Sequence, residues 1–394
     1  MDLRETLDNK TSWGILALVV IVLILFVRCS ADNPTENRTA PKAITPAASG
    51  SYIRLLLQTE NADNALINVN LSGDGKRAVA GIGNRIAFIN VPEKKVRATT
   101  INNLNTSVSD VIASKDGETA VYRYVWGQLI GIIDSKFQTF WSMKLDNAYS
   151  MDATGDLSVV AVVTMPPDNK PGGLAIETED KEKGIKFTDS TGSDVSVSQS
   201  GNYIAVAKGG FDIIIDTKEG PDVRSSGFNG ASLYNREGDL LWNYRTKKHA
   251  LCIKILDNKR LVIVGDDSGL ITALNLRNGK PVWSGEYGGY FAANDDFIIA
   301  RKDGTVAMFS TNGDLLWRSN IYPGIYCGKQ CIAVSKSGNS IVGTIANYDA
   351  LVFDRSGNLL WQKRYNARPV VSMSEDGKTW AVGDNRVEIY EITK

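Results

Sequence analysis

Histidine is nearly absent from this sequence, since His249 is the only one among 394 residues. Histidine is the usual acid/base group at neutral pH and a common metal ligand, so a multi-histidine metal site is excluded. A histidine-based catalytic triad could use only this residue, and its position before the apolar run 250–256 favours a simple turn. We expect no catalytic residue, no bound cofactor and no metal ligand.

An excess of positive charge is also lacking. The chain holds 44 Lys and Arg against 44 Asp and Glu, which gives a net charge of zero. Proteins that bind nucleic acid usually carry a basic excess, because neutralising phosphates supplies much of the affinity. Nucleic acid is therefore not an expected partner.

Cysteine is scarce, with four residues and no adjacent pair. Cys327 and Cys331 are close enough in sequence to close a small disulfide, which would require an oxidising compartment. A redox-active pair is the alternative interpretation of the same spacing.

Charged side chains are missing altogether from Thr11 to Val27. A helix of that length spans about 25 Å, at the short end for crossing a bilayer. We predict a short tail at 1–12, a transmembrane anchor at 13–28 and a flexible, polar linker at 29–51. A cleaved signal peptide is the competing interpretation, although the mixed charges of the first ten residues disfavour it.

The orientation of this anchor rests on weaker features, because the positive charges on its two sides balance. Acceptor triplets for N-glycosylation begin at Asn37, Asn70 and Asn105, and a disulfide would favour the same side of the membrane. These features predict a single-pass protein of the cell membrane whose folded part lies on the extracytoplasmic side.

Short apolar runs separated by polar turns fill the rest of the chain, 52–394. The turn is clearest in four copies, Ser72-Gly-Asp-Gly75, Ser114-Lys-Asp-Gly117, Ser335-Lys-Ser-Gly338 and Ser374-Glu-Asp-Gly377. Asp, Asn and Gly suit such turns because they tolerate positive φ. Units of about 40 residues with four short strands are typical of propeller blades.

A second mark is a glycine four residues before a tryptophan. It ends at Trp242, Trp283, Trp317 and Trp361, and a decayed copy ends at Trp141. A small sheet with two apolar faces must bury both against its neighbours, and tryptophan is well sized to fill the wedge between them. We predict that these five tryptophans dock blade against blade.

The repeats predict an all-β propeller of about eight four-stranded blades, with seven as the alternative if the irregular third blade is incomplete. The last blade has only three strands before Lys394. We expect the unassigned strand 52–58 to supply the fourth, which would join the two ends of the domain and remove exposed edges.

Residues 263–287 resemble the tryptophan-docking repeat of pyrroloquinoline-quinone-type propellers, through Ala273, Gly279, Lys280 and Trp283. The catalytic members of that family hold a quinone and calcium, usually against adjacent cysteines, and this chain has no such cysteine pair. The resemblance therefore implies the non-catalytic branch, which includes the propeller lipoprotein of the bacterial outer-membrane barrel-assembly machine.

Enlarged loops between the second and third strands gather in blades two to four. Insertions survive at low cost in loops, which are also where function usually resides. We predict a partner-binding rim there, with the candidate contact residues Tyr124, Trp126, Pro166, Pro167, Lys170, Phe211, Arg224 and Phe228.

The preferred interpretation is a membrane-anchored assembly scaffold with a protein partner, and not an enzyme. Two alternatives stay open. One is a receptor that binds a glycan or small ligand in the central channel, and the other is a quinone-dependent dehydrogenase.

Overall fold

The computed structural model describes residues 52–60, 67–101, 106–124, 129–165, 171–178, 181–186, 190–217, 220–302, 304–321, 329–344 and 348–393. All of them belong to one structural unit, Thr45–Lys394. The predicted tail, anchor and linker lie outside the described residues. Within the described ranges, no helix has the length and apolar character that crossing a bilayer requires.

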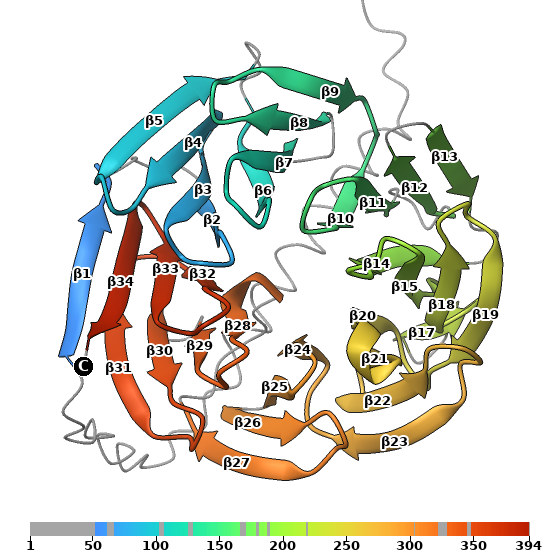
Figure 1. The fold of residues 1–394 in the computed structure, drawn as a ribbon. Coiled ribbons are helices and arrows are strands. Elements are labelled where there is room, and N and C mark those ends of the chain that lie inside the picture. Colours follow the sequence, from blue (N-terminus) through green and yellow to red (C-terminus); the bar gives the residue numbers. More distant parts are fainter. Residues whose placement is uncertain are drawn as a thin grey trace, which may run out of the picture. The chain divides into compact units, whose positions relative to one another are not determined.

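Eight antiparallel sheets of four strands each follow one another around a ring (Figure 1). The strands of the first two blades are β2 (Ile67–Leu71), β3 (Arg77–Ile82), β4 (Arg85–Asn90) and β5 (Lys95–Thr100), then β6 (Val108–Ala113), β7 (Thr119–Tyr124), β8 (Ile130–Asp134) and β9 (Thr139–Met143). Those of blades three and four are β10 (Ala148–Ala153), β11 (Val159–Thr164), β12 (Gly173–Thr178) and β13 (Lys181–Lys186), then β14 (Thr191–Val197), β15 (Tyr203–Gly209), β18 (Gly230–Asn235) and β19 (Leu240–Arg245).

The second half of the ring has the same plan. The strands of blades five and six are β20 (Ala250–Leu256), β21 (Leu261–Asp266), β22 (Leu270–Asn275) and β23 (Pro281–Glu286), then β24 (Tyr290–Ala293), β25 (Phe297–Lys302), β26 (Thr305–Ser310) and β27 (Leu315–Asn320). Those of blades seven and eight are β28 (Ile332–Val334), β29 (Ser340–Gly343), β30 (Asp349–Phe353) and β31 (Leu359–Arg364), then β32 (Val370–Met373), β33 (Thr379–Gly383), β34 (Val387–Thr393) and β1 (Tyr52–Gln58). Two short 3-10 helices, η2 (Asp257–Lys259) and η3 (Lys329–Cys331), lie in connections.

The eighth blade closes the ring with strands from both ends of the domain. β1 pairs with β34 in an antiparallel register from Tyr52↔Thr393 to Gln58↔Glu388. The prediction of eight blades closed in this way is confirmed, and the seven-bladed alternative is wrong. Pairing β1 with β34 covers the outer edge of β34 and joins the two ends of the domain.

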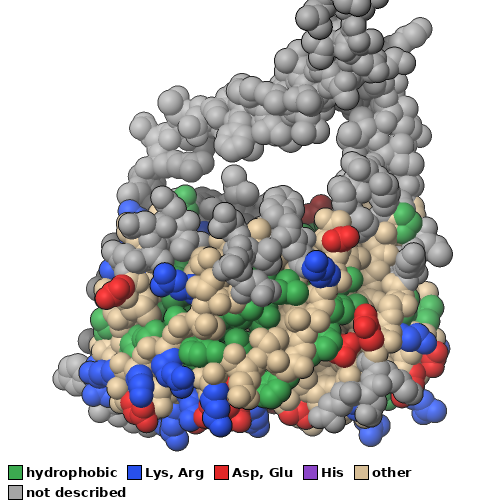
Figure 2. Space-filling model, turned by 90° about the horizontal axis from the view of Figure 1, so that it is seen from above, with side chains coloured by type: hydrophobic (Ala, Val, Ile, Leu, Met, Phe, Trp, Pro, Cys, Tyr) green, Lys and Arg blue, Asp and Glu red, His purple; other side chains and the backbone are tan. Residues whose placement is uncertain are grey.

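Middle strands of the blades are buried on both faces because each blade is packed between two others. Val262, Ile263 and Val264 of β21 are at most 1% exposed. Continuous apolar runs therefore replace the alternation expected of a sheet with one wet face. Apolar side chains also reach the outer surface, and Figure 2 shows them in a band above an edge where Lys, Arg, Asp and Glu gather.

The turns between first and second strands share one hydrogen-bonding pattern. Ser72 Oγ donates to Asp74 Oδ1 at 2.8 Å and accepts a hydrogen bond from Arg77 N at 3.0 Å. The donor–acceptor pair recurs at Ser114, Thr154 and Ser374 with distances of 2.6 to 2.7 Å. The serine side chain thus closes the turn that its sequence pattern predicts. We call this side of the ring the turn face, and the side with the loops between second and third strands the loop face.

Tryptophans on the outermost strands dock onto the next blade. Trp242 of blade four donates its Nε1 hydrogen to Leu276 O of blade five at 2.8 Å. A Cβ atom added to Gly279 would lie 2.8 Å from the Trp242 ring, so only glycine lets the ring approach this closely. The glycine and the tryptophan of the repeat are therefore two halves of one interface, contributed by consecutive blades.

The same contact is repeated twice further along the ring. Trp283 packs on Gly313, and its Nε1 donates to Thr311 O at 2.9 Å. The ring of Trp317 packs on Gly357 in the same way, but its Nε1 makes no hydrogen bond. Trp361 meets no turn glycine in blade eight, because the two outer strands of that blade, β34 and β1, are not consecutive in sequence. Its ring instead packs on Trp380 and Tyr390, with centroids 5.7 and 4.8 Å away.

Candidate protein-interaction site

An extra hairpin leaves blade four on the loop face, between β15 and β18. Its strands, β16 (Phe211–Thr217) and β17 (Gly220–Ser226), pair with each other as a separate two-stranded sheet. This insertion lies where the sequence predicted an enlarged loop, and it places Phe211 and Arg224 on its two strands. The four other strands of the blade keep their regular pairing around it.

The base of this hairpin is held by hydrogen bonds and by a cation–π contact. Asn229 accepts from Gly210 N through its side chain at 2.6 Å and from Thr246 N through its carbonyl at 3.0 Å. The ring of Phe228 lies within 5.9 Å of Lys208 Nζ and 5.5 Å of Arg245 Cζ. Phe228, a predicted rim residue, thus stabilises the place where the hairpin joins its blade.

The structure corrects the prediction that Tyr124 belongs to the partner-binding rim. Its side chain is fully buried, and its hydroxyl donates to Ile101 O of the preceding blade at 2.5 Å. Burial raises the pKa of Tyr124 to about 12. This tyrosine therefore packs blade two against blade one and cannot meet a partner. The sequence could not show this because the last residue of a strand can point to either side of the blade.

The remaining rim residues, Trp126, Pro166, Pro167 and Lys170, lie outside the described residues. Their place in a partner contact stays a prediction. Phe211 and Arg224 are described through their backbone, and only Phe228 has a described side chain that is in part accessible.

The mouth of the central channel adjoins the hairpin on the loop face. It forms a cavity of about 430 Å³ whose lining includes Tyr149, His249, Tyr290 and Arg368. Burial raises the pKa of Tyr290 to about 12, and burial also lowers the pKa of Arg368. His249 lies beside Gly209, the last residue of β15. Tyr290 therefore stays a neutral hydrogen-bonding group at physiological pH, next to a guanidinium that remains charged.

Acidic side chains deeper in the channel accept hydrogen bonds that link the innermost strands of neighbouring blades. Asp194 Oδ1 accepts from Ser150 Oγ at 2.7 Å, and its Oδ2 accepts from Ile253 N at 3.0 Å. One carboxylate thereby joins the innermost strands of blades three, four and five. Asp152 likewise accepts from Lys254 Nζ at 3.2 Å. These carboxylates have structural partners, so they are poor candidates for general acids or bases.

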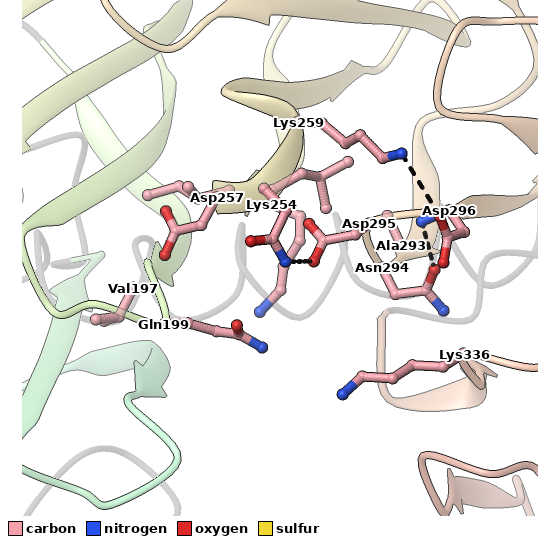
Figure 3. A pocket seen from close by; sticks show the side chains of 13 residues that line it. Val197, Gln199, Lys254, Asp257, Lys259, Ala293, Asn294, Asp295, Asp296 and Lys336 are labelled. Carbon is pink, nitrogen blue, oxygen red and sulfur yellow. Dashed lines mark hydrogen bonds and ion pairs between the residues drawn. The ribbon is translucent and has the colours of Figure 1, made fainter.

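A second cavity, of about 500 Å³, opens where the channel reaches the turn face. Figure 3 shows Gln199, Lys254 and Lys336 pointing into the same space from different blades. η2 replaces the regular turn of blade five here, so that Lys259 Nζ pairs with Asp296 Oδ1 at 3.5 Å and Asn258 donates to Asp295. Both acids that blade six brings to this cavity are thus engaged, and so are two of its lysines, Lys254 with Asp152 at 3.2 Å and Lys336 with Glu375 at 2.5 Å.

The cysteines and metal ligands complete the inventory of reactive groups. Cys331 takes part in a disulfide bond, and the buried thiol of Cys252 donates to Phe291 O at 3.4 Å. Cys327 lies outside the described residues, so the predicted pairing of Cys327 with Cys331 stays a prediction. Among the residues that the structure describes, no group of three or more His, Cys, Asp or Glu side chains could hold a metal ion.

The architecture defines this chain as an all-β, eight-bladed β-propeller. The C-terminal WD40 domain of Sif2 matches it with a TM-score of 0.65 at 12% identity, over 87% of this chain and 99% of that domain. The Dos1 propeller matches with a TM-score of 0.63 at 11% identity, over 86% and 95% of the two chains. The β-propeller domain of Cps50 (Swd1) from Myceliophteria thermophila matches with a TM-score of 0.53 at 10% identity, over 85% and 100%.

Similarity at this level of identity shows a shared fold alone. No protein-family model matches the sequence, and no curated protein matches it. None of these comparisons points to the quinone-type repeat family or to the barrel-assembly lipoprotein, so that resemblance stays a prediction.

Proposed function

We propose that this chain is a protein-interaction scaffold that binds its partner through the hairpin β16–β17 and the adjoining mouth of the channel. One observation carries the proposal. The hairpin pairs with no strand of blade four, yet its base is fixed by Asn229 and by the contacts of Phe228. An element that the blade does not need, held on a rigid base beside a cavity, is typical of a binding loop on a scaffold.

Replacing residues 211–226 by a short Gly-Asn-Gly turn tests this directly. The variant should keep its fold and lose the partner that co-purifies with the full chain, as identified by quantitative mass spectrometry after crosslinking. Leu316→Ser, on the exposed perimeter of blade six, is the matched control and should retain the partner. An unchanged set of partners in the hairpin variant would contradict the proposal.

We also propose that the scaffold is anchored by residues 13–28 in the cell membrane, with the propeller on the extracytoplasmic side. The uncharged run Thr11–Val27 supports the anchor, and the disulfide at Cys331 supports an oxidising compartment. Alkaline carbonate extraction of native membranes should leave the chain in the pellet, and external protease should digest the propeller in intact cells. Release by carbonate, or protection from the protease, would contradict the anchor or the orientation respectively.

We further infer that blades four to seven are tryptophan-docking repeats of the non-catalytic kind. The contacts of Trp242 on Gly279 and of Trp283 on Gly313 support this relationship. Protein purified from its native membrane should show no quinone absorbance and no stoichiometric calcium. Finding either would favour the dehydrogenase alternative.

A small-ligand receptor is the second candidate function, and the cavity at the channel mouth favours it. Tyr149, Tyr290 and Arg368 bring aromatic faces and a positive charge to one space, which suits a glycan acid or another small anion. Uronic acids should then raise the melting temperature of the full chain, and Arg368→Gln should abolish that shift while neutral sugars give none.

A further inference from the structure

A groove of about 480 Å³ opens at the perimeter between blades two and three, on the side of the turn face. Phe140 and Trp141 of blade two form one wall, and Leu157, Val160 and Glu177 of blade three are part of the other. The Phe140 side chain is 63% exposed although it is large and apolar. Figure 2, which looks onto the perimeter at the top of Figure 1, shows apolar side chains exposed in this part of the surface.

At this interface the docking contact has only one of its two halves. Trp141 stands where the docking tryptophans stand in blades four to six, so it should pack on a glycine in the next blade. In blade three, however, Thr178 pairs directly with Lys181, and the two residues between them are Glu179 and Asp180. Neither of these two residues is a glycine. At the interface of blades seven and eight the same lack is filled by aromatic side chains, whereas the strands β11, β12 and β13 carry no aromatic residue.

An unsatisfied carboxylate lies in the same groove. Glu177 Oε2 is buried and has no hydrogen-bond partner, although a buried acceptor without a donor costs about 1–3 kcal/mol. Glu177 is also directly opposite Glu182 in the pairing of β12 with β13, and like charges in that arrangement repel. Burial, and then the charge of Glu182, raise the pKa of Glu177. Glu177, Glu182 and the exposed aromatic wall of the groove therefore lie close together, and one cation would interact favourably with all three.

We propose that this groove binds an arginine side chain presented by an extended segment of a partner protein. The guanidinium would donate to Glu177 and Glu182, and its flat face would pack on Trp141. Arginine fits better than lysine because its planar fork offers several donors and stacks on aromatic rings, whereas the lysine ammonium is a strongly hydrated point charge. An apolar neighbour of the arginine would cover Phe140. This contact goes beyond the proposed hairpin site, since it lies on the other side of the ring.

Fluorescence anisotropy with two labelled hexapeptides tests the proposal on the full chain in detergent. Both peptides carry leucines around one central residue, which is arginine in the first and citrulline, its uncharged analogue, in the second. The arginine peptide should bind at least about tenfold more tightly. Glu177→Gln should remove that preference, and Trp141→Ala should weaken the binding of both peptides. Equal affinity of the two peptides for the unaltered chain would overturn the proposal.

Two further variants separate this site from folding and from the hairpin. Glu177→Gln removes an unfavourable charge, so its melting temperature should be at least that of the unaltered chain, and its loss of arginine preference cannot be blamed on misfolding. The hairpin deletion should bind the arginine peptide unchanged, so failure of the hairpin proposal leaves this one standing. Leu316→Ser, exposed beside a docked tryptophan, should also leave the affinity unchanged. Loss of preference in Leu316→Ser would show that the peptide binds the apolar perimeter at large and would overturn the site.

Discussion

Two groups of blade interfaces are built from the same motif with opposite results. The first group joins blade four to five, five to six and six to seven, and the second is the single interface between blades two and three. In the first group, a tryptophan and a turn glycine from consecutive blades close the wedge, as Trp242 does on Gly279. In the second, Trp141 packs on a cluster that includes Leu157 and Val160 without a docking glycine, and a groove adjoins its ring. The difference teaches that the repeat is a contact shared by two units, and that losing one half turns a packing position into a candidate binding position.

Removing a docked tryptophan should have the largest effect. Trp242 is 9% exposed and its indole is hydrogen-bonded to the next blade, so Trp242→Ala should lower the free energy of unfolding by about 3–4 kcal/mol. Trp141→Ala, at a half-buried ring beside an open groove, should cost less than about 1.5 kcal/mol. Urea denaturation of both variants measures the two values. Equal losses would break the comparison.

The closing interface provides a third way of filling the wedge. Glu388 of blade eight is fully buried and accepts hydrogen bonds from Lys363 Nζ at 2.7 Å, Tyr390 OH at 2.6 Å and Tyr365 OH at 2.9 Å. Lys363 and Tyr365 lie on blade seven, so this carboxylate ties the last two blades together. Glu388→Gln should destabilise the domain by about 2–3 kcal/mol, because the lysine loses its counter-charge.

The loss of stability caused by Glu388→Gln should depend on pH in a defined direction. Burial alone would raise the pKa of Glu388, but the hydrogen bonds from Lys363 and the two tyrosines outweigh it and hold that pKa below its usual value. A lowered pKa contributes stability above the unfolded value, and this contribution disappears as the pH falls through the folded value. Urea midpoints of the unaltered chain and Glu388→Gln should therefore differ at pH 7 and converge near pH 3. A difference that persists in acid would assign the effect to packing and not to charge.

Adding one carbon to a docking glycine should have an intermediate effect. Gly313 has φ of +92°, and an added Cβ would lie 2.9 Å from the Trp283 ring, so Gly313→Ala should cost about 2 kcal/mol. Gly184 in β13 is the matched control, because a Cβ there would meet nothing within 4 Å. Gly184→Ala should change the stability by less than about 0.5 kcal/mol. Thermal unfolding measures the stability of both variants. A similar loss of stability in Gly184→Ala would show that the tryptophan contact is not the cause.

Deleting the hairpin should have the smallest effect on stability. Residues 211–226 form a sheet of their own and no ladder with blade four, so the variant with a Gly-Asn-Gly turn should unfold within about 1 kcal/mol of the unaltered chain. Calorimetry checks this value. A large loss would mean that the hairpin supports the blade, which would weaken its assignment as a partner-binding element.

Much of this molecule is determined by the sequence alone, because a propeller repeats its local chemistry. Polar turns, five of which start with serine, and glycine four residues before tryptophan indicate the blades, their number and the closure by β1. Each of these marks acts through its own backbone or through a neighbour one period away. The enlarged loop of blade four was also evident, because an insertion interrupts the period. Its pairing into β16–β17 was less evident, because only its first strand is an apolar run.

Only the tertiary structure decided what each interface contains. Tyr124 reads as a rim residue by position, yet it is buried because Ile101 of the previous blade offers its carbonyl. Trp141 reads as another docking residue, yet its ring lines a groove, and neither residue between Thr178 and Lys181 is a glycine. In both cases the deciding partner belongs to another blade, and the fit between two surfaces depends on side-chain volumes that no single repeat records.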